Sequence, residues 1–403
     1  MTRAAGEATR AAAAAALVLV AAVGAYRALR PLPRYSDEIH HYKQIRGFCE
    51  GDYTPNPRVT TIPGYHALSA LVGRVTGDCS LQQMRRVNAV IGVLSVAAFF
   101  AAARSAGAAV PIARTLQYFF LPILLPYHFL VYADSISLLA NLATLALLLR
   151  GRFLLAGLVG SLSILVRQTN VVWLALVCLV AYMDAAEVRS APHPLTAWLR
   201  RIWTALLGLA GFGLFVLWNG AVAVGGRGAF AAGFHTGNLF LFLALYFVLF
   251  LPANVAAFRR RAGRLADPTL WVLLALAYVL FLTTFRVDHP FNKFEGFLRN
   301  EMLSAVASSL LYKHLFFAFA AAGLIALYLT RLRRTSLYAI YPLALATLLP
   351  LRLIEHRYGL PAFVLLLVCR EDDPAPVEYG GVALLALLSG VALYVLARGL
   401  WML

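Results

Sequence analysis

Charged residues are scarce in this sequence. They make up 13% of 403 residues, against 61% hydrophobic residues and a mean hydropathy of +0.76, which leaves too little polar surface to cover a soluble globule. The apolar runs contain Gly and Pro and are about 15 to 22 residues long, roughly the length of a membrane-spanning helix, which excludes a barrel of short alternating strands. The sequence therefore predicts an all-α polytopic membrane protein.

Lysine and acidic residues are also few. The lysines are Lys43, Lys293 and Lys313, so arginine supplies nearly all of the formal charge of +17. In a soluble protein this balance would suggest a nucleic-acid partner. Here most arginines lie in short connections between apolar runs, where they fix orientation and contact anionic lipid, and no basic motif is interleaved with aromatics. We expect membrane lipid as a partner and no nucleic acid.

The sequence lacks internal repeats, a low-complexity tail and a linker long enough to divide domains, so residues 1–403 are expected to form one domain. The first apolar run continues to about Tyr26 without a clear signal cleavage site, which favours a retained first span. About thirteen spans are predicted, within a range of eleven to thirteen. They lie near residues 11–29, 88–108, 115–131, 135–149, 153–166, 171–184, 202–222, 238–257, 269–285, 309–330, 336–350, 353–369 and 380–397.

The connections between these spans differ in charge. By parity, the arginine-rich connections share one side, which the positive-inside rule makes cytosolic. Their arginines are Arg104, Arg114, Arg150, Arg152, Arg189, Arg200, Arg201, Arg259, Arg260, Arg261, Arg264, Arg331, Arg333 and Arg334. The unusual polar segments fall on the other side, at 30–87, 132–134, 167–170, 223–237, 286–308 and 355–358. This segregation predicts one water-facing site on the non-cytosolic face, with residues 30–87 as its first loop.

Four arginines lie on the face where the positive-inside rule disfavours them. Since arginine binds phosphate with a planar fork of donors, and charged groups at membrane depth usually line a substrate path, they indicate an anionic substrate. The four are Arg167, Arg286, Arg299 and Arg357. The alternative for any one of them is an ion pair between helices, such as Arg357 with Glu355 or Arg286 with Asp288.

Two adjacent carboxylates, Asp37 and Glu38, follow the first span. Neighbours in sequence do not face each other on a helix, so position alone does not say which of the two does chemistry. A positioned carboxylate can act as general base toward a sugar hydroxyl. The alternative is a solvated pair that caps the following helix.

Histidines and cysteines raise two further possibilities. A zinc site of His40 and His41 with Glu38, His235 or His289 lacks the defined ligand spacing of metal sites, so no metal is expected. Cys49 and Cys79 lie on the same predicted face and can form a disulfide in an oxidising compartment, a possibility that the sequence leaves open. Cys178 and Cys369 fall in apolar spans and are expected in the core.

A series of motifs runs from about residue 35 to about 361. The first loop contains Asp37-Glu38-Ile39 with His41, then Gln44, Cys49-Glu50-Gly51, and Pro57 with Thr60-Thr61-Ile62-Pro63-Gly64. Later motifs are Arg85 with Val87-Asn88, Tyr132 with Asp134, Arg167-Gln168-Thr169-Asn170 with Trp173, Asn219-Gly220 with His235, His289-Pro290, and Glu355 with Arg357-Tyr358. The series resembles the endoplasmic-reticulum alpha-1,2-glucosyltransferases that use dolichyl-phosphate glucose. Where that family commonly has Asp-Asn-Arg-His-Tyr, this chain has Phe297-Leu298-Arg299-Asn300-Glu301, so only the arginine matches.

The resemblance implies a GT-C type bundle with its site in a luminal cavity of the endoplasmic reticulum membrane. It implies transfer of glucose, with inversion and without a cofactor, from dolichyl-phosphate glucose to a dolichyl-diphosphate oligosaccharide for N-glycosylation. Asp37 is expected to be the base, with Glu38 orienting it or binding sugar hydroxyls. The expected substrate-binding residues are His41, Thr60, Thr61, Arg167, Gln168, Asn170, His235, His289, Arg299, Glu355, Arg357 and Tyr358.

Three alternatives remain at this point. A secondary transporter would also place polar residues beside interrupted spans, but it predicts internal pseudo-symmetry and binding groups near span centres. A GT-C enzyme with another polyprenyl-phosphate sugar or another acceptor would share the same motifs. A non-catalytic membrane subunit that kept the fold would tolerate substitution of Asp37.

Overall fold

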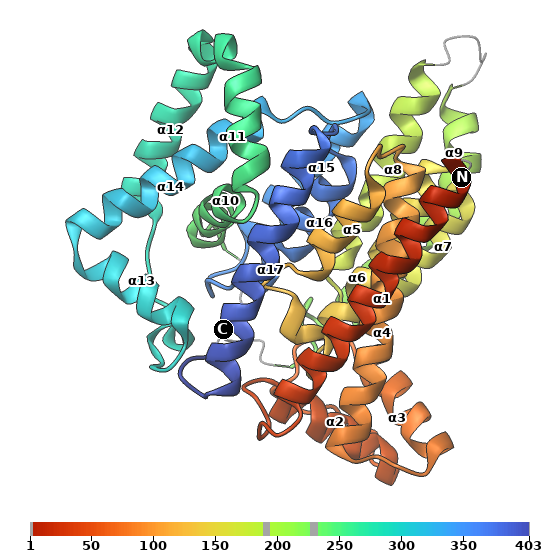
Figure 1. Cartoon of the computed structure of the whole chain (residues 1–403). Helices are drawn as coiled ribbons and strands as arrows, with labels where there is room; N and C mark the ends of the chain where they lie inside the picture. The colour runs from red at the N-terminus through yellow and green to blue at the C-terminus, as the bar shows by residue number, and fades with distance from the viewer. Residues whose placement is uncertain (1–2, 188–193, 226–232, 403) are drawn as a thin grey trace.

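The computed structural model describes residues 3–187, 194–225 and 233–402, which form an almost entirely helical bundle (Figure 1). In this part of the chain, strand-like pairing is limited to two isolated bridges, Phe297 with Met402 and Leu332 with Arg370. Arg189 and residues 226–232, which belong to two of the predicted connections, lie outside the described residues. The prediction of an all-α polytopic membrane protein is confirmed.

The helices follow one another with short connections. The α-helices are α1 (Arg3–Leu29), α2 (Glu38–Glu50), α3 (Gly64–Thr76), α4 (Leu81–Ser105), α5 (Pro111–Phe119), α6 (Asp134–Leu149), α7 (Phe153–Ile164), α8 (Asn170–Glu187), α9 (Pro194–Asn219), α10 (Gly237–Leu249), α11 (Leu251–Arg260), α12 (Pro268–Thr284), α13 (Leu298–Ser308), α14 (Leu310–Leu329), α15 (Ile340–Leu348), α16 (Leu360–Cys369) and α17 (Ala375–Ala397). The 3-10 helices are η1 (Leu125–His128), η2 (Ala262–Ala266), η3 (Pro290–Lys293), η4 (Thr335–Ala339) and η5 (His356–Gly359).

Five helices of the described chain are long and apolar enough to cross a membrane, and a sixth crossing is possible if the bent pair α10 and α11 counts as one span. The five are Glu7–Leu29, Leu81–Ser105, Leu195–Asn219, Leu310–Leu329 and Ala375–Ala397. Shorter apolar helices are Asp134–Leu149, Phe153–Ile164, Asn170–Asp184, Pro268–Thr284, Thr335–Leu348 and His356–Cys369. The expected eleven to thirteen spans therefore stay a prediction as far as these shorter helices are concerned.

Two predicted spans are not single helices. The span at 115–131 is divided into α5 and η1, because Pro122 and Pro126 lack the N–H that an uninterrupted helix needs. The span at 238–257 bends by 84° between α10 and α11, where Pro252 lies in the first turn of α11. Neither stretch is one continuous helix, because proline lies within each apolar run, and the two spans themselves stay predictions.

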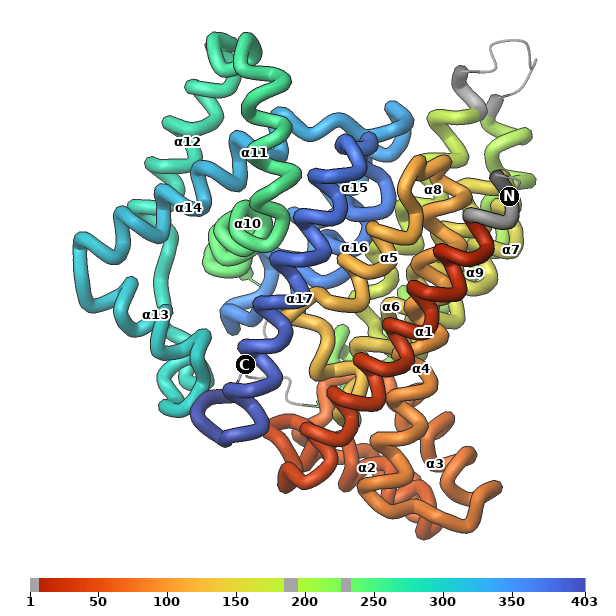
Figure 2. The backbone as a smooth tube through the Cα atoms, viewed as in Figure 1, coloured from red at the N-terminus to blue at the C-terminus, as the bar shows by residue number. Residues whose placement is uncertain are grey.

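The two classes of connection gather at opposite ends of the bundle. Figure 2 shows α2 and α3 at one end, near the last turn of α17, and the connection from α11 to α12 at the other end, where α1 also begins. Among the described residues, contacts of Arg150 with Ser105, Arg333 with Gly107 and Arg334 with Leu149 join the arginine-rich connections to one another. We call the end that holds them the arginine-rich end, and the segregation predicted from parity is present in this part of the chain.

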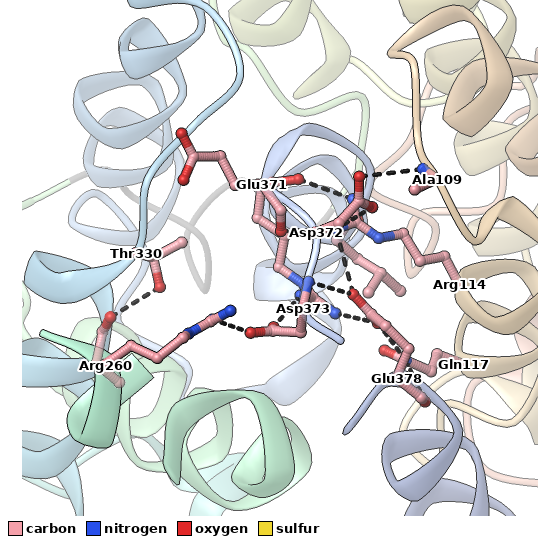
Figure 3. Close-up of polar contacts among 12 residues, drawn as sticks. Ala109, Arg114, Gln117, Arg260, Thr330, Glu371, Asp372, Asp373 and Glu378 are labelled. Carbon is pink, nitrogen blue, oxygen red and sulfur yellow. Dashed lines mark hydrogen bonds and ion pairs between the residues drawn. The ribbon is translucent and has the colours of Figure 1, made fainter. Parts of the chain in front are cut away.

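A network of charged residues holds the arginine-rich end together (Figure 3). Arg114 on α5 is fully buried and donates hydrogen bonds to the carbonyl oxygens of Leu367 and Val368, the last turn of α16. Its guanidinium also pairs with Glu378 on α17 and with Asp372. Because the last carbonyls of a helix have no partner within the helix, Arg114 satisfies groups that would otherwise be buried and unpaired.

Candidate active site

An ion pair in the first loop sets the position of the candidate site. Glu38, at the start of α2, and Arg85 on α4 are both completely buried, and their side chains make two hydrogen bonds of 2.9 and 2.6 Å. Arg85 also donates to the carbonyl oxygens of Leu29, Arg30, Leu32 and Pro33. The pair thus ties the end of α1 and the chain that follows it to α4.

Both carboxylate oxygens of Glu38 accept hydrogen bonds from other groups of the protein. Besides Arg85, its carboxylate accepts hydrogen bonds from the backbone N–H groups of Tyr35 (3.0 Å) and Val131 (2.9 Å). A carboxylate without exposed surface and with its oxygens engaged does not reach a sugar hydroxyl. The structure therefore corrects the expectation that Glu38 binds sugar hydroxyls, whereas the expectation that it orients Asp37 stays a prediction that agrees with its role of holding the loop.

Asp37 points differently from its neighbour, as expected for consecutive residues. Its side chain is 50% exposed, and Oδ2 accepts a hydrogen bond of 2.8 Å from Nη2 of Arg357. Ser36 precedes it with a φ of 47°, in the left-handed region that a residue with a side chain adopts only at some cost. Since Asp37 is the N-cap and Glu38 the first residue of α2, the two side chains point in different directions, and the Asp37 carboxylate stays accessible.

Arg357, on η5, is the centre of the cluster. Beyond Asp37, its guanidinium lies 3.5 Å from Glu355 and 3.9 Å from Asp134, measured between the nearest nitrogen and oxygen atoms. It also lies over the rings of Tyr127 and Tyr132, at 5.5 and 5.1 Å from the ring centroids. Aromatic faces and three carboxylates hold the planar group in one orientation.

Two further arginines complete the cluster. Arg167 forms an ion pair with Asp134, and Arg299 forms one with Glu355. This geometry agrees with the expectation that Arg167 and Arg299 share a region with Arg357. It also agrees with the alternative that Arg357 pairs with Glu355. Asp288 pairs with Arg352 at 3.1 Å rather than with Arg286.

The cluster is electrically balanced before any substrate is bound. It contains three arginines, Arg167, Arg299 and Arg357, and three carboxylates, Asp37, Asp134 and Glu355. An added phosphate would leave an excess of negative charge unless it takes over a guanidinium that a carboxylate now holds. Asp37 is the most exposed of the three carboxylates, so it is the easiest one to release.

The surroundings of Asp37 and His41 determine whether these side chains are charged. Removal from water raises the pKa of the Asp37 carboxyl, but the Arg357 guanidinium beside it more than offsets this effect and keeps the pKa below its usual range. Burial lowers the pKa of His41 to about 4, although Asp37 opposes the shift. At neutral pH, Asp37 is therefore ionised and His41 is neutral.

Several expected site residues support the loop instead. The Gln168 side chain joins residues 60–62, because Nε2 donates to the Thr60 carbonyl (2.6 Å) and Oε1 accepts from the Ile62 N–H (3.3 Å). Asn170 is buried and bonds to Ser137, Asn141 and Ser163. These contacts correct the expectation that Asn170 meets substrate. The Thr61 hydroxyl is buried without a hydrogen-bond partner.

The remaining expected residues lie in other surroundings. His235 is partly exposed, and its backbone N–H donates to Leu349. His289 is buried, and its Nδ1 accepts from the Phe291 N–H at 3.2 Å, as the cap of η3. Tyr358 packs against the hydrophobic core. None of these contacts indicates a role in binding substrate.

Three residues of this region were not among the predicted site residues. Asp134 pairs with Arg167, His66 bonds to His41, and His356 lies 3.1 Å from Glu355. Tyr132 and Asp134, two positions further on, belong to the motif series, so the sequence contains a signal for Asp134. No pattern in the sequence marks His66, because its partner lies on another helix.

The structure answers the disulfide question, whereas the expected absence of a metal stays a prediction. Among the described residues, no group of three or more His, Cys, Asp or Glu side chains is arranged to hold a metal ion. Cys49 and Cys79 form a disulfide that joins α2 to the turn before α4, which confirms the possibility seen in the sequence, and Cys178 and Cys369 are buried. A pocket of about 610 Å³ lies at the arginine-rich end, away from Asp37, and is lined by Arg333, Arg334 and Ser336 among others.

The fold and the cluster define a polytopic helical membrane protein with a charged site at the end of the bundle that carries the first loop. A sequence model of the DIE2/ALG10 family matches residues 32–194 and 185–368. Because these ranges include most of the chain, the chain belongs to this family.

Individual relatives match over shorter stretches. The Arabidopsis thaliana protein named Dol-P-Glc:Glc(2)Man(9)GlcNAc(2)-PP-Dol alpha-1,2-glucosyltransferase is 31% identical over 170 residues, which is 37% of this chain and 33% of the relative. The Rattus norvegicus protein of the same name is 26% identical over 272 residues, 54% of this chain and 57% of the relative. The chain thus spans between about a third and three fifths of the length of these curated relatives.

One solved structure is similar at low identity. The crystal structure of ArnT from Cupriavidus metallidurans bound to undecaprenyl phosphate aligns with 94% of this chain and 77% of that chain, with 15% identity and a TM-score of 0.38. A likeness of this extent supports neither a shared mechanism nor a shared ligand.

Proposed function

We propose that this protein is an inverting alpha-1,2-glucosyltransferase of the endoplasmic reticulum membrane. It transfers glucose from dolichyl-phosphate glucose to the terminal glucose of a dolichyl-diphosphate-linked oligosaccharide, with the site facing the lumen. Membership of the DIE2/ALG10 family and the names of the matched relatives support this assignment. The observation that carries it is the half-exposed Asp37 carboxylate beside the Arg357 guanidinium.

The chemistry needs few groups. The bond between glucose C1 and the phosphate oxygen breaks, dolichyl phosphate leaves, and an acceptor hydroxyl oxygen forms the new bond from the opposite face of the sugar. Phosphate is already a good leaving group, so the protein has to supply one base for the hydroxyl proton and cations for the phosphate charge. Asp37 takes the proton, while Arg357, Arg167 and Arg299 stabilise the phosphate.

Arg357 links the two tasks. With Arg357 on Asp37, the pKa of the carboxyl is low and the carboxylate is a weak base. A donor phosphate that takes over this guanidinium leaves Asp37 with less positive charge nearby, so its pKa rises toward its ordinary value. Donor binding thereby strengthens the base, and the acceptor is activated only when the donor is present.

A transporter is the alternative from another class. Transporter sites lie near the centre of the membrane between repeated halves. The charged cluster here lies at one end of the bundle, and the sequence has no internal repeat, so these features favour the enzyme. A related transferase with another sugar or acceptor uses the same groups, and only a direct assay separates the two.

That assay uses the full chain purified in detergent. Given labelled dolichyl-phosphate glucose and a diglucosylated lipid-linked oligosaccharide, it should yield a glycan one hexose heavier, and acceptors with fewer glucoses should react poorly. Asp37→Asn serves as the inactive control. The absence of transfer under conditions that support a related enzyme, or equal transfer by Asp37→Asn, would count against the proposal.

A further inference from the structure

His66 lies beside the candidate site without a role in the mechanism above. It is on α3, has no exposed surface, and its Nε2 lies 2.9 Å from Nδ1 of His41 on α2. The ring planes are nearly parallel, with centroids 5.1 Å apart and an angle of 15° between the planes. The other ring nitrogen of His66, Nδ1, is buried without a hydrogen-bond partner.

These contacts determine which nitrogen carries each proton. One arrangement has His41 donating from Nδ1, and the neutral His66 then carries its own proton on Nδ1, where no acceptor exists. The other has His66 donating from Nε2, which leaves only a lone pair without a partner. Buried N–H groups without an acceptor are rarer than buried acceptors without a donor, so the second arrangement is favoured.

The second arrangement places the remaining proton of His41 on Nε2. This atom has no hydrogen-bond partner among the described residues, and the side chain is partly exposed. His41 interacts electrostatically with Asp37, Arg357, Asp134 and Arg167, the charged groups of the cluster. An N–H group that remains open beside these residues is available to a ligand.

We propose that His66 is a positioning residue that fixes His41 as the Nε2–H tautomer, so that His41 donates a hydrogen bond to a substrate oxygen beside Asp37. The proposal rests on the proposed function. The acceptor is an oxygen of the donor phosphate or of a sugar hydroxyl. In this form, His41 presents no lone pair to the site, so it acts neither as base nor as metal ligand.

Two substitutions of His66 test the proposal. His66→Phe keeps a ring against His41 but removes the donor, whereas the amide of His66→Gln places an N–H near the position of Nε2. A hydrogen bond to a substrate oxygen contributes about 0.5 to 3 kcal/mol, so His66→Phe should lose up to about a hundredfold in kcat/KM, and His66→Gln should recover most of this loss. A loss in donor Kd identifies a phosphate oxygen, and a loss in acceptor KM identifies a hydroxyl.

A double-substitution cycle separates positioning from general stability. If His66 acts through His41, adding His66→Phe to His41→Asn should cost nothing further, whereas independent effects would add. The tautomer is measured directly by nitrogen NMR of histidine-labelled protein, with His41 assigned from the His41→Asn spectrum. An unprotonated His41 Nε2, or equal losses in His66→Phe and His66→Gln, would overturn the proposal. An inactive wild type would instead refute the proposed function, and the NMR result would still decide the tautomer.

Discussion

Two groups of charged residues at opposite ends of the bundle differ in whether their polar groups remain accessible to a ligand. At the arginine-rich end, Arg114, Arg370 and Glu378 have at most 6% of their side chains exposed, and they pair with one another and with helix carbonyls (Figure 3). At the other end, Asp37 is half exposed, and His41 keeps an open N–H group. The first group is buried and paired within the protein, although Nε of Arg114 and Nε of Arg370 have no hydrogen-bond partner in the described part of the chain, whereas the second group exposes a carboxylate that a ligand can reach.

The difference also separates the two carboxylates of the first loop. Glu38, with Arg85, resembles the network at the arginine-rich end, since both side chains are fully buried and paired. Asp37, one residue earlier, belongs to the charged cluster around Arg357, which we call the open cluster. Its members are Asp37, Asp134, Arg167, Arg299, Glu355 and Arg357. Substitutions should therefore act on stability at Arg114 and Glu38, and on catalysis or binding at Asp37 and Arg357.

The largest effect is expected from Asp37→Asn. The amide keeps the shape but cannot accept the proton, and a positioned base contributes about a hundredfold to ten-thousandfold in rate, so kcat should fall by that order. The melting temperature should change little, because the side chain is half exposed. Turnover and thermal unfolding in detergent measure the two effects.

Arg46→Ala is the matched control, since Arg46 lies on the same loop in an exposed pair with Glu50 and should be silent. If turnover of Asp37→Asn stayed within about threefold of wild type, Asp37 would not be the base.

Arg114→Ala should mainly reduce stability. It leaves Glu378 buried with one partner fewer and the last carbonyls of α16 unpaired, and breaking a buried pair in this way costs about 3 to 5 kcal/mol. The thermal midpoint in detergent should fall strongly, while the fraction that remains folded keeps its kcat. A lower kcat with an unchanged midpoint would contradict the division between the two ends.

The fold class and the members of the open cluster could be predicted from the sequence, whereas the contacts between these members could not. Charge segregation and the motif series identified Asp37, Arg167, Arg299 and Arg357, because an arginine on the wrong face is visible without a structure. The partner of Asp37 lies 320 residues further along the chain, so no local pattern specified that pair. The ion pair of Glu38 with Arg85 joins residues that are 47 positions apart, so no local pattern specified it either.

Other errors have local causes that the sequence contained. Pro122 lies within an apolar run that is long enough to span the membrane, and because proline lacks an N–H, the run is divided into α5 and η1. Asn170 is polar and lies three residues after Arg167, yet it begins α8 and is buried, where it bonds to Ser137, Asn141 and Ser163. Polarity of a short motif therefore predicted a region, but not which of its side chains face the substrate.

Arg357 provides a test of the link between binding and base strength. Arg357→Ala removes a charged hydrogen bond to phosphate, worth about 1.5 to 3 kcal/mol, so donor affinity should fall by about tenfold to a hundredfold. It also removes the group that lowers the pKa of Asp37, so the acid limb of the pH–rate profile of the free enzyme should move to higher pH.

Arg357→Lys should restore affinity only in part, since an ammonium group lacks the planar fork of donors. An unchanged acid limb in Arg357→Ala would indicate that Asp37 is not the titrating base.

The smallest predicted effect is a loss of stability on acidification. His41 has a folded pKa of about 4, and burial also lowers the pKa of His66, whereas both titrate near 6.5 when unfolded. Between these values the unfolded chain binds more protons, so stability is complete above about pH 6.5 and declines as the pH falls toward 4. From pH 7 to 5 the loss should be on the order of 1 to 2 kcal/mol for each of the two histidines. His66→Phe removes one of these groups, so its melting temperature should depend less on pH than that of wild type.

The open cluster would then differ from the arginine-rich end in a second respect, because the buried ion pairs there are not expected to titrate in this range. An equal pH dependence in His66→Phe and wild type would show that the fold does not hold His66 neutral.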